Sequence, residues 1–271
     1  MADPADVLRS TFGDELRRWR DARRFSQLAL AAAAGVSQRH LSFLETGRSK
    51  PSRDMVLHLA HTLELPLRAQ NVLLATAGYS PEYTERPLDD PELDEVRRVL
   101  QTALDGQLPF PARVVDREWD IVLANAAWAQ LALLCGIDVP VDVGKNALRL
   151  CLHPDGIRPA IVDWEPFALS LIHRLEREAV RRPFDERLGA LVAEVQTYPG
   201  IADLPDRVLC APSDDLMVPI VLETVVGRLQ FVSMTAVLGA PFDITIEELH
   251  IETLLPADRH TEYALRGTIQ K

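Results

Sequence analysis

The segment Ser26–Gly47, "SQLALAAAAGVSQRHLSFLETG", decides the fold of the first part of the chain. A run of four alanines ends at Gly35, and a polar cluster follows at once. Two helices that cross closely need small side chains at the crossing, and the alanines provide them. Gly35 allows a left-handed turn that is too tight for most residues with a Cβ atom. We therefore expect two short helices that pack across a sharp turn.

The second helix of this pair carries its polar side chains outward. Leu41 and Leu44, three residues apart, face the first helix, and Ser37 is a typical N-cap residue. A rigid helix with short polar or basic side chains at its N-terminal end suits the reading of base edges in the DNA major groove. The positions left facing outward are Gln38, Arg39, His40, Ser42 and Phe43.

Three residues of this helix need separate interpretation. His40 is either an exposed bystander or a DNA contact. Phe43 either lies over a thymine methyl group or packs on a neighbouring helix. Glu45 is expected to bind the protein's own backbone or an arginine, because phosphate would repel a carboxylate.

Helical periodicity continues on both sides of the pair, over residues 12–77. Leu16 and Trp19 mark an amphipathic helix before it. After it, Ser52 is the expected N-cap of a fourth helix, and Pro66 suits the first turn of a fifth. The pattern predicts five helices and no strand in this part of the chain.

The distribution of charge fits a nucleic-acid partner for the first part only. The whole chain carries a net charge of −11, but residues 11–53 hold nine basic and four acidic residues, a balance of +5. Residues 81–271 carry a balance of −14, which is largely screened beyond the Debye length of about 8 Å. The basic segment therefore sets the field near a bound phosphate, while the overall acidity lowers non-specific affinity for nucleic acid.

Composition excludes several classes of protein. With 47% hydrophobic residues the chain can bury a sizeable core, which excludes wholesale disorder. Cys135, Cys151 and Cys210 lie far apart without a C-x-x-C pair, which argues against a disulfide framework and fits a reducing compartment. The sequence has neither a signal peptide nor an apolar run of membrane-spanning length. We expect a soluble, cytoplasmic protein without membrane contact.

Residues 12–51 resemble the helix-turn-helix of the XRE or phage-repressor family. The shared features are the Ser26-Gln27 pair, the spacing of Ala31 and Gly35, the GVS and L-S-x-L-E-x-G motifs, and Pro51. The resemblance implies an all-α, five-helix domain with residues 37–46 as the recognition helix. We expect this domain to bind double-stranded DNA as a homodimer. It implies base contacts by Gln38, Arg39 and Ser42, with His40 open, and phosphate contacts by Gln27, Ser37, Arg48 and Lys50.

A linker is expected after these helices, because "YSPEYTERPLDDP" contains three prolines. Residues 92–104 then suit a connecting helix. The chain is accordingly divided into a DNA-binding domain (1–84), a linker with its helix (85–106) and a C-terminal domain (107–271).

The C-terminal part mixes strand and helix patterns. "ARVVDREWDIVLAN" predicts two short strands around a tight turn, and "LMVPIVLETVVGRLQFVSMTAVLG" predicts a β-hairpin that turns near Gly227. Helices are expected in "PAIVDWEPFALSLIHRLEREAVRR" and "FDERLGALVAEVQTY", and a further strand in "ELHIETLLP". This order indicates an α+β domain with helices over one face of an antiparallel sheet.

Reactive side chains give little support for an enzyme. The sequence lacks a nucleophile elbow, a Walker loop, a dinucleotide fingerprint and an H-E-x-x-H motif. His250 with Glu252, and Cys151 with His153, are better explained as ordinary polar residues than as metal ligands. We expect no catalytic residue, metal or cofactor. A DNA-targeted enzyme and a helical protein-interaction module remain as alternatives.

A second resemblance concerns residues 107–267. "ARVVDREWDIVLANAAWAQL" resembles the opening of a PAS-like domain, and "LRLCLHPDG" and "GAPFDITIEELHIETLLPADRHTEYALR" are similar to the C-terminal domain of MmyB-like transcription regulators. The resemblance implies a PAS-like α/β ligand-binding domain and does not identify the ligand. Because small-molecule sites are usually apolar pockets, we expect a small apolar or fatty-acid-like ligand. Large apolar side chains give the candidate pocket residues Trp128, Trp164, Phe231 and Met234. Arg113, Arg149 or Arg158 either neutralises a ligand carboxylate or lies at the surface.

Overall fold

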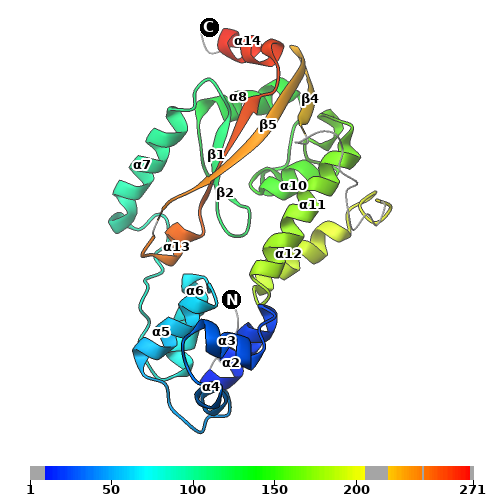
Figure 1. Cartoon of the computed structure of the whole chain (residues 1–271). Coiled ribbons are helices and arrows are strands. Elements are labelled where there is room, and N and C mark those ends of the chain that lie inside the picture. The colour runs from blue at the N-terminus through cyan, green and yellow to red at the C-terminus, as the bar shows by residue number, and fades with distance from the viewer. Residues whose placement is uncertain (1–9, 205–218, 240, 269–271) are drawn as a thin grey trace. The chain divides into compact units, whose positions relative to one another are not determined.

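The computed structural model describes residues 10–204, 219–239 and 241–268, and it divides into two compact units (Figure 1). The first unit holds the chain up to Pro87 and also residues 241–247. The second unit holds residues 88–239 and the chain from Glu248 onward. Cys210 and the first residues of the predicted hairpin segment lie outside the described residues.

The five predicted helices of the first unit are confirmed. Ser26, Ser37 and Ser52 each accept a hydrogen bond from the backbone N–H three residues further on, so all three are N-caps. Gly35 has a φ of 65°, as the sharp turn requires. Pro66 stands at the N-cap itself, one position earlier than expected. The helices are α2 (Phe12–Ala22), α3 (Gln27–Ala33), α4 (Gln38–Glu45), α5 (Arg53–Thr62) and α6 (Leu67–Thr76).

Two further segments complete the first unit. The stretch expected to be a linker lies against α6, where the Asn71 side chain binds the backbone of Tyr83 in both directions. The second segment contains the short helix α13 (Ile244–Glu247). It joins the first segment through Asp243, which accepts a hydrogen bond of 2.8 Å from the Thr84 hydroxyl.

The second unit contains an antiparallel sheet of six strands in the order β2-β1-β6-β5-β4-β3, which confirms the α+β prediction. The hairpin turns at Gly227, where φ is 100°. One segment that was expected to be wholly helical contains the two-residue strand β3. The helix starts only after Asp163, whose φ of 50° separates it from this strand. The strands are β1 (Ala112–Val115), β2 (Ile121–Ala124), β3 (Ile161–Val162), β4 (Ile220–Thr224), β5 (Gly227–Val237) and β6 (His250–Pro256).

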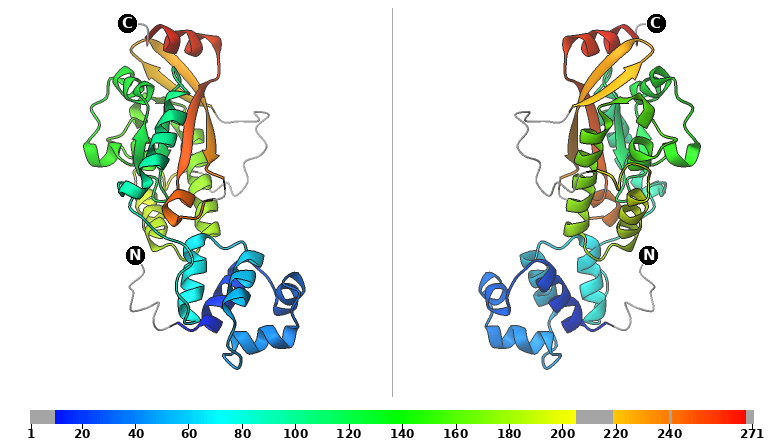
Figure 2. Two further views of the ribbon diagram at one scale, coloured as in Figure 1. Left: turned by 90° about the vertical axis from the view of Figure 1, so that its left-hand side faces the viewer. Right: turned by 90° about the vertical axis from the view of Figure 1, so that its right-hand side faces the viewer.

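Helices cover both faces of β1, although one covered face was expected. Ala112 and Val114 pack with Leu100 and Leu104 of α7, whereas Val115 joins the larger core under the remaining helices. Figure 2 shows α7 and the α10–α12 group on different sides of the sheet. The helices are α7 (Asp94–Asp105), α8 (Ala126–Cys135), α9 (Val141–Gly144), α10 (Ala147–Leu152), α11 (Trp164–Arg181), α12 (Glu186–Gln196) and α14 (Arg259–Thr268), with 3-10 turns η1 (Pro91–Leu93) and η2 (Arg158–Ala160).

Candidate nucleic-acid interface and ligand site

The N-terminal end of α4 is accessible. Ser37, Gln38 and Arg39 are exposed, and His40 and Ser42 are half-buried. The other side of the helix is held inside the unit by Leu41 and Leu44, both fully buried. The structure therefore gathers the predicted base-contacting side chains on one accessible helix end, where the helix dipole also favours an anion.

Phe43 lies next to two arginines at this surface. The guanidinium of Arg39 is 5.2 Å from the centre of its ring, and that of Arg48 is 5.9 Å away. Cation–π attraction at such distances holds a guanidinium near the ring face. Half-buried Phe43 thus restrains two cations beside α4. Lys50 is placed similarly, with its Nζ atom 5.9 Å from the Tyr79 ring.

Glu45 fastens the end of α4 to the two preceding helices. Its buried carboxylate accepts hydrogen bonds from Arg20 Nε at 2.6 Å and from Gln27 Nε2 at 2.8 Å, and Arg17 Nε is 3.4 Å away. Burial works to raise the pKa of Glu45, but the hydrogen bonds from Arg20 and Gln27 outweigh it and hold the pKa below its ordinary value. The expectation that Glu45 binds an arginine is confirmed.

Gln27, predicted to contact phosphate, therefore also has a role inside the unit. A side-chain amide carries two N–H donors, so the bond to Glu45 does not use up its capacity. Its predicted phosphate contact stays a prediction.

Gly13, Arg17 and Arg20 also hold α4 in place and were not predicted from the sequence. A Cβ atom on Gly13 would lie 2.4 Å from the backbone oxygen of Glu45, so only glycine lets α2 begin against the end of α4. A glycine in the first turn of a helix was the available signal, because it lowers helix propensity without a local benefit.

The four predicted pocket residues do not meet in one cavity. Trp128 lines a cavity of about 440 Å³, and Trp164 lines a separate, more open one. Phe231 is fully buried in the core, and Met234 is 44% exposed on β5. The cavity beside Trp128 is mainly apolar, with Leu131, Cys135, Leu150 and Ile157 among its lining residues.

The three arginines considered for a ligand carboxylate have different surroundings. Arg149 makes two hydrogen bonds of 2.7 Å to Glu194. The guanidinium of Arg158 lies 3.5 Å from the centre of the Trp164 ring. Arg113 is buried, so the surface interpretation does not apply to it.

The residue pairs that were considered as metal ligands include side chains that make hydrogen bonds within the protein. Glu252 accepts hydrogen bonds from Arg113 and Arg174, and burial lowers the pKa of His250. His153 Nδ1 accepts a hydrogen bond from its own loop. Within the described ranges, no group of three or more His, Cys, Asp or Glu residues could hold a metal ion. Burial raises the pKa of the Cys151 thiol to about 11.

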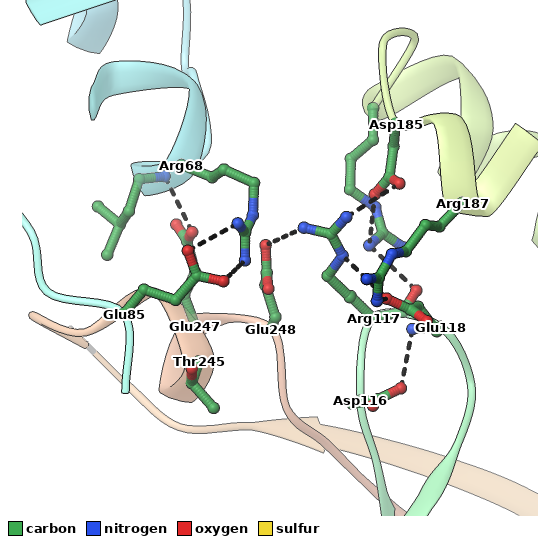
Figure 3. A network of polar contacts seen from close by, with 12 residues as sticks. Arg68, Glu85, Asp116, Arg117, Glu118, Asp185, Arg187, Thr245, Glu247 and Glu248 are labelled. Carbon is green, nitrogen blue, oxygen red and sulfur yellow. Dashed lines mark hydrogen bonds and ion pairs between the residues drawn. The ribbon is translucent and has the colours of Figure 1, made fainter. Parts of the chain in front are cut away.

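The β1–β2 turn of the second unit is held by a cluster of ion pairs (Figure 3). Arg117 lies 3.2 Å from Asp185 and 3.4 Å from Glu248, and Arg187 binds Glu118. Arg117 and Glu118 lie in the turn directly after β1, the strand that carries Arg113. No helix among the described residues is both long and apolar enough to cross a membrane.

A helix-turn-helix unit with an accessible helix end, in one chain with an α+β domain that carries a mainly apolar cavity, is typical of a transcription regulator. Comparison with known families supports both parts: residues 11–71 match the helix-turn-helix domain, and residues 96–267 match the MmyB-like transcription regulator ligand binding domain. The chain belongs to the MmyB-like transcription regulators. The helix-turn-helix domain implies DNA binding, and the finer XRE assignment stays a prediction.

Relatives in two bacteria agree with this assignment. Proteins named as uncharacterized HTH-type transcriptional regulators of Mycobacterium bovis and Mycobacterium tuberculosis are 34% identical over 216 residues, covering 69% of this chain and 84% of each relative. A solved structure of an RNA-binding light-oxygen-voltage receptor is 15% identical, with 97% of this chain and 63% of that chain covered. The TM-score of this match is 0.27.

Proposed function

We propose that the protein binds a near-palindromic DNA site as a homodimer and that a small apolar ligand in its C-terminal domain modulates this binding. One observation carries the DNA half of the proposal: the accessible end of α4, with Arg39 and Arg48 restrained on Phe43. A symmetric dimer would present two such helices about 34 Å apart, one turn of the duplex.

The proposed DNA contacts form two groups, those to base edges and those to phosphate oxygens. Arg39 suits bidentate bonding to guanine, and Gln38 suits adenine. Arg48 and Lys50, in the loop after α4, suit phosphate oxygens, which position the protein without reading sequence. The proposed base-facing residues are Gln38, Arg39, His40 and Ser42, and the proposed phosphate contacts are Gln27, Ser37, Arg48 and Lys50.

The ligand half of the proposal is supported by the cavity beside Trp128. Its volume of about 440 Å³ lies in the range of about 300–1,000 Å³ that small-molecule sites occupy. Its lining is mainly apolar, as a fatty-acid-like molecule requires. Trp164, Phe231 and Met234 lie outside the lining of this cavity.

The chain path supports modulation of DNA binding by the ligand. A ligand shifts activity only if it binds two arrangements of the protein with different affinity. The chain leaves β5 of the second unit, contributes residues 241–247 to the first unit and returns as β6. A change at the ends of β5 and β6 would therefore be transmitted to residues 241–247, a segment that is bonded to α6.

Native mass spectrometry of the full chain, with and without a duplex chosen by binding-site selection, tests the proposal. We expect a 2:1 complex of protein and duplex, and a co-purified small molecule on the protein. Failure to bind any duplex at low salt, where phosphate contacts are strongest, would overturn it.

A further inference from the structure

The loop that carries Lys50 is held by Tyr79, a residue that follows α6. This loop, residues 46–52, joins α4 to α5. The Tyr79 hydroxyl donates a hydrogen bond of 2.9 Å to the Pro51 carbonyl, and the Lys50 Nζ atom lies 5.9 Å from the centre of the Tyr79 ring. Cation–π attraction acts at that distance. One side chain therefore holds both the backbone of the loop and the cation that is proposed to contact phosphate.

Tyr79 owes its position to the end of α6. Gly78, with a φ of 83°, ends the helix in the left-handed conformation, and the Tyr79 N–H donates to the Leu74 carbonyl at 2.9 Å. Three residues further on, Glu82 forms an ion pair with Arg53, the first residue of α5. Both side chains of this pair are 40% exposed, so the pair contributes little. Tyr79 is therefore the principal link between the segment after α6 and the loop.

Residues 79–86 are held on α6 by one side-chain amide. The Asn71 Oδ1 atom accepts hydrogen bonds from the backbone N–H groups of Glu82 and Tyr83, at 2.9 and 3.1 Å. The Asn71 Nδ2 atom donates to the Tyr83 carbonyl at 2.7 Å. Because both groups of the amide bind the same stretch of backbone, this stretch has a fixed position along α6. The segment that was expected to be a linker is thus packed into the first unit.

The far end of this segment is bonded to the chain between β5 and β6. The Thr84 hydroxyl donates to Asp243 at 2.8 Å, and the Thr84 carbonyl accepts a hydrogen bond of 2.8 Å from the Ile244 N–H. Asp243 is buried, and it also accepts a hydrogen bond of 3.0 Å from the Arg86 guanidinium. Residues 79–86 therefore bind the α4–α5 loop at one end and the chain between β5 and β6 at the other.

We propose that residues 79–86 couple the chain between β5 and β6 to phosphate binding, with Tyr79 as the residue that positions Lys50. A loop that is held in place before DNA arrives loses less conformational freedom on binding. A displacement at Asp243 that loosens the segment therefore lowers the affinity for phosphate, whatever the base sequence. This inference rests on the proposed DNA binding and is independent of which ligand the C-terminal domain takes.

Fluorescence anisotropy of the full chain with a duplex chosen by binding-site selection tests the positioning role. Tyr79→Phe removes the bond to Pro51 and should weaken binding by about two- to tenfold, as expected for one hydrogen bond. It should add little to Lys50→Ala, because the two changes act through the same phosphate contact. The matched control is Tyr83→Phe, which should keep the wild-type affinity, because the Tyr83 hydroxyl donates to Gln70 of α6 at 3.1 Å.

Asp243→Ala tests the coupling, since it removes the acceptor for the Thr84 hydroxyl at the far end of the segment. It should weaken DNA binding at least about twofold in the wild type and leave the affinity of Tyr79→Phe unchanged. Thr84→Val removes the donor alone and replaces Asp243→Ala if that variant does not fold. Circular dichroism checks that each variant is fully folded at the temperature used, since lost stability lowers the apparent affinity only through an unfolded fraction.

Each outcome of these measurements decides a separate point. Wild-type affinity of Tyr79→Phe, a loss of the same size in Tyr83→Phe, or a full further loss on top of Lys50→Ala would overturn the positioning role. Equal losses from Asp243→Ala in the wild type and in Tyr79→Phe would overturn the coupling. DNA binding itself stands in all of these cases. Failure of the wild type to bind any duplex at low salt would instead overturn the proposed function.

Discussion

The Glu247 carboxylate accepts a hydrogen bond of 2.9 Å from the backbone N–H of Leu67, the first residue of α6 (Figure 3). Pro66 stands at the N-cap and makes no side-chain hydrogen bond to the helix. A residue 180 positions along the chain therefore caps α6. Its negative charge is also favourable at the positive end of the helix dipole.

Replacing Glu247 should destabilise the first unit. Glu247→Ala leaves the Leu67 N–H without this acceptor, and loss of a helix cap costs about 0.5–2 kcal/mol. Urea unfolding followed by circular dichroism would measure the loss. Glu247→Gln keeps an acceptor oxygen and should lose less, and a fully wild-type stability of Glu247→Ala would show that the cap contributes nothing.

Glu45 should make the first unit sensitive to acid. Since its pKa in the fold is below the ordinary value of about 4.3, its stabilising effect is complete above that pH and is lost as pH falls through the folded pKa. Glu45→Gln should be less stable at pH 7, on the order of 3 kcal/mol for breaking a buried ion pair. The variant's stability should also vary less between pH 6 and 3, and equal pH slopes for the two proteins would contradict this role.

Gly13 should not tolerate a methyl group. In Gly13→Ala the new Cβ meets the backbone of Glu45 at 2.4 Å, and such overpacking costs about 1–3 kcal/mol. Gly189 of α12 is the matched control, because a Cβ there meets no atom within 4 Å. Gly189→Ala should stabilise by up to about 1 kcal/mol through helix propensity. Thermal unfolding of both variants checks the opposite signs.

Much of the fold was predictable because its signals are local. Ser26, Ser37 and Ser52 cap helices within three residues of themselves, and Gly35 makes a turn that its own φ determines. For Glu45, the sequence predicted the type of hydrogen-bond partner but not the particular residues. Its partners come from two other helices, and no local pattern says which arginine arrives.

The ligand site was harder to predict, because residue type does not say which way a large side chain points. Phe231 and Met234 are both large and apolar and lie on one strand, yet Phe231 is fully buried and Met234 is 44% exposed. Arg113 was a candidate by its charge alone. Its partner Glu252 lies 139 residues away, and only the sheet pairing brings the two side chains close.

Arg39 and Arg48 lie on the same aromatic ring but should affect DNA binding differently. Arg39→Ala should relax base preference at one position in each half-site, at a cost of about 1–3 kcal/mol. Arg48→Ala should weaken binding to all sequences alike and reduce the slope of log affinity against log salt by about one. Binding-site selection and salt titration of both variants separate the two effects. Should the Arg39→Ala protein select the wild-type motif unchanged, Arg39 does not read a base.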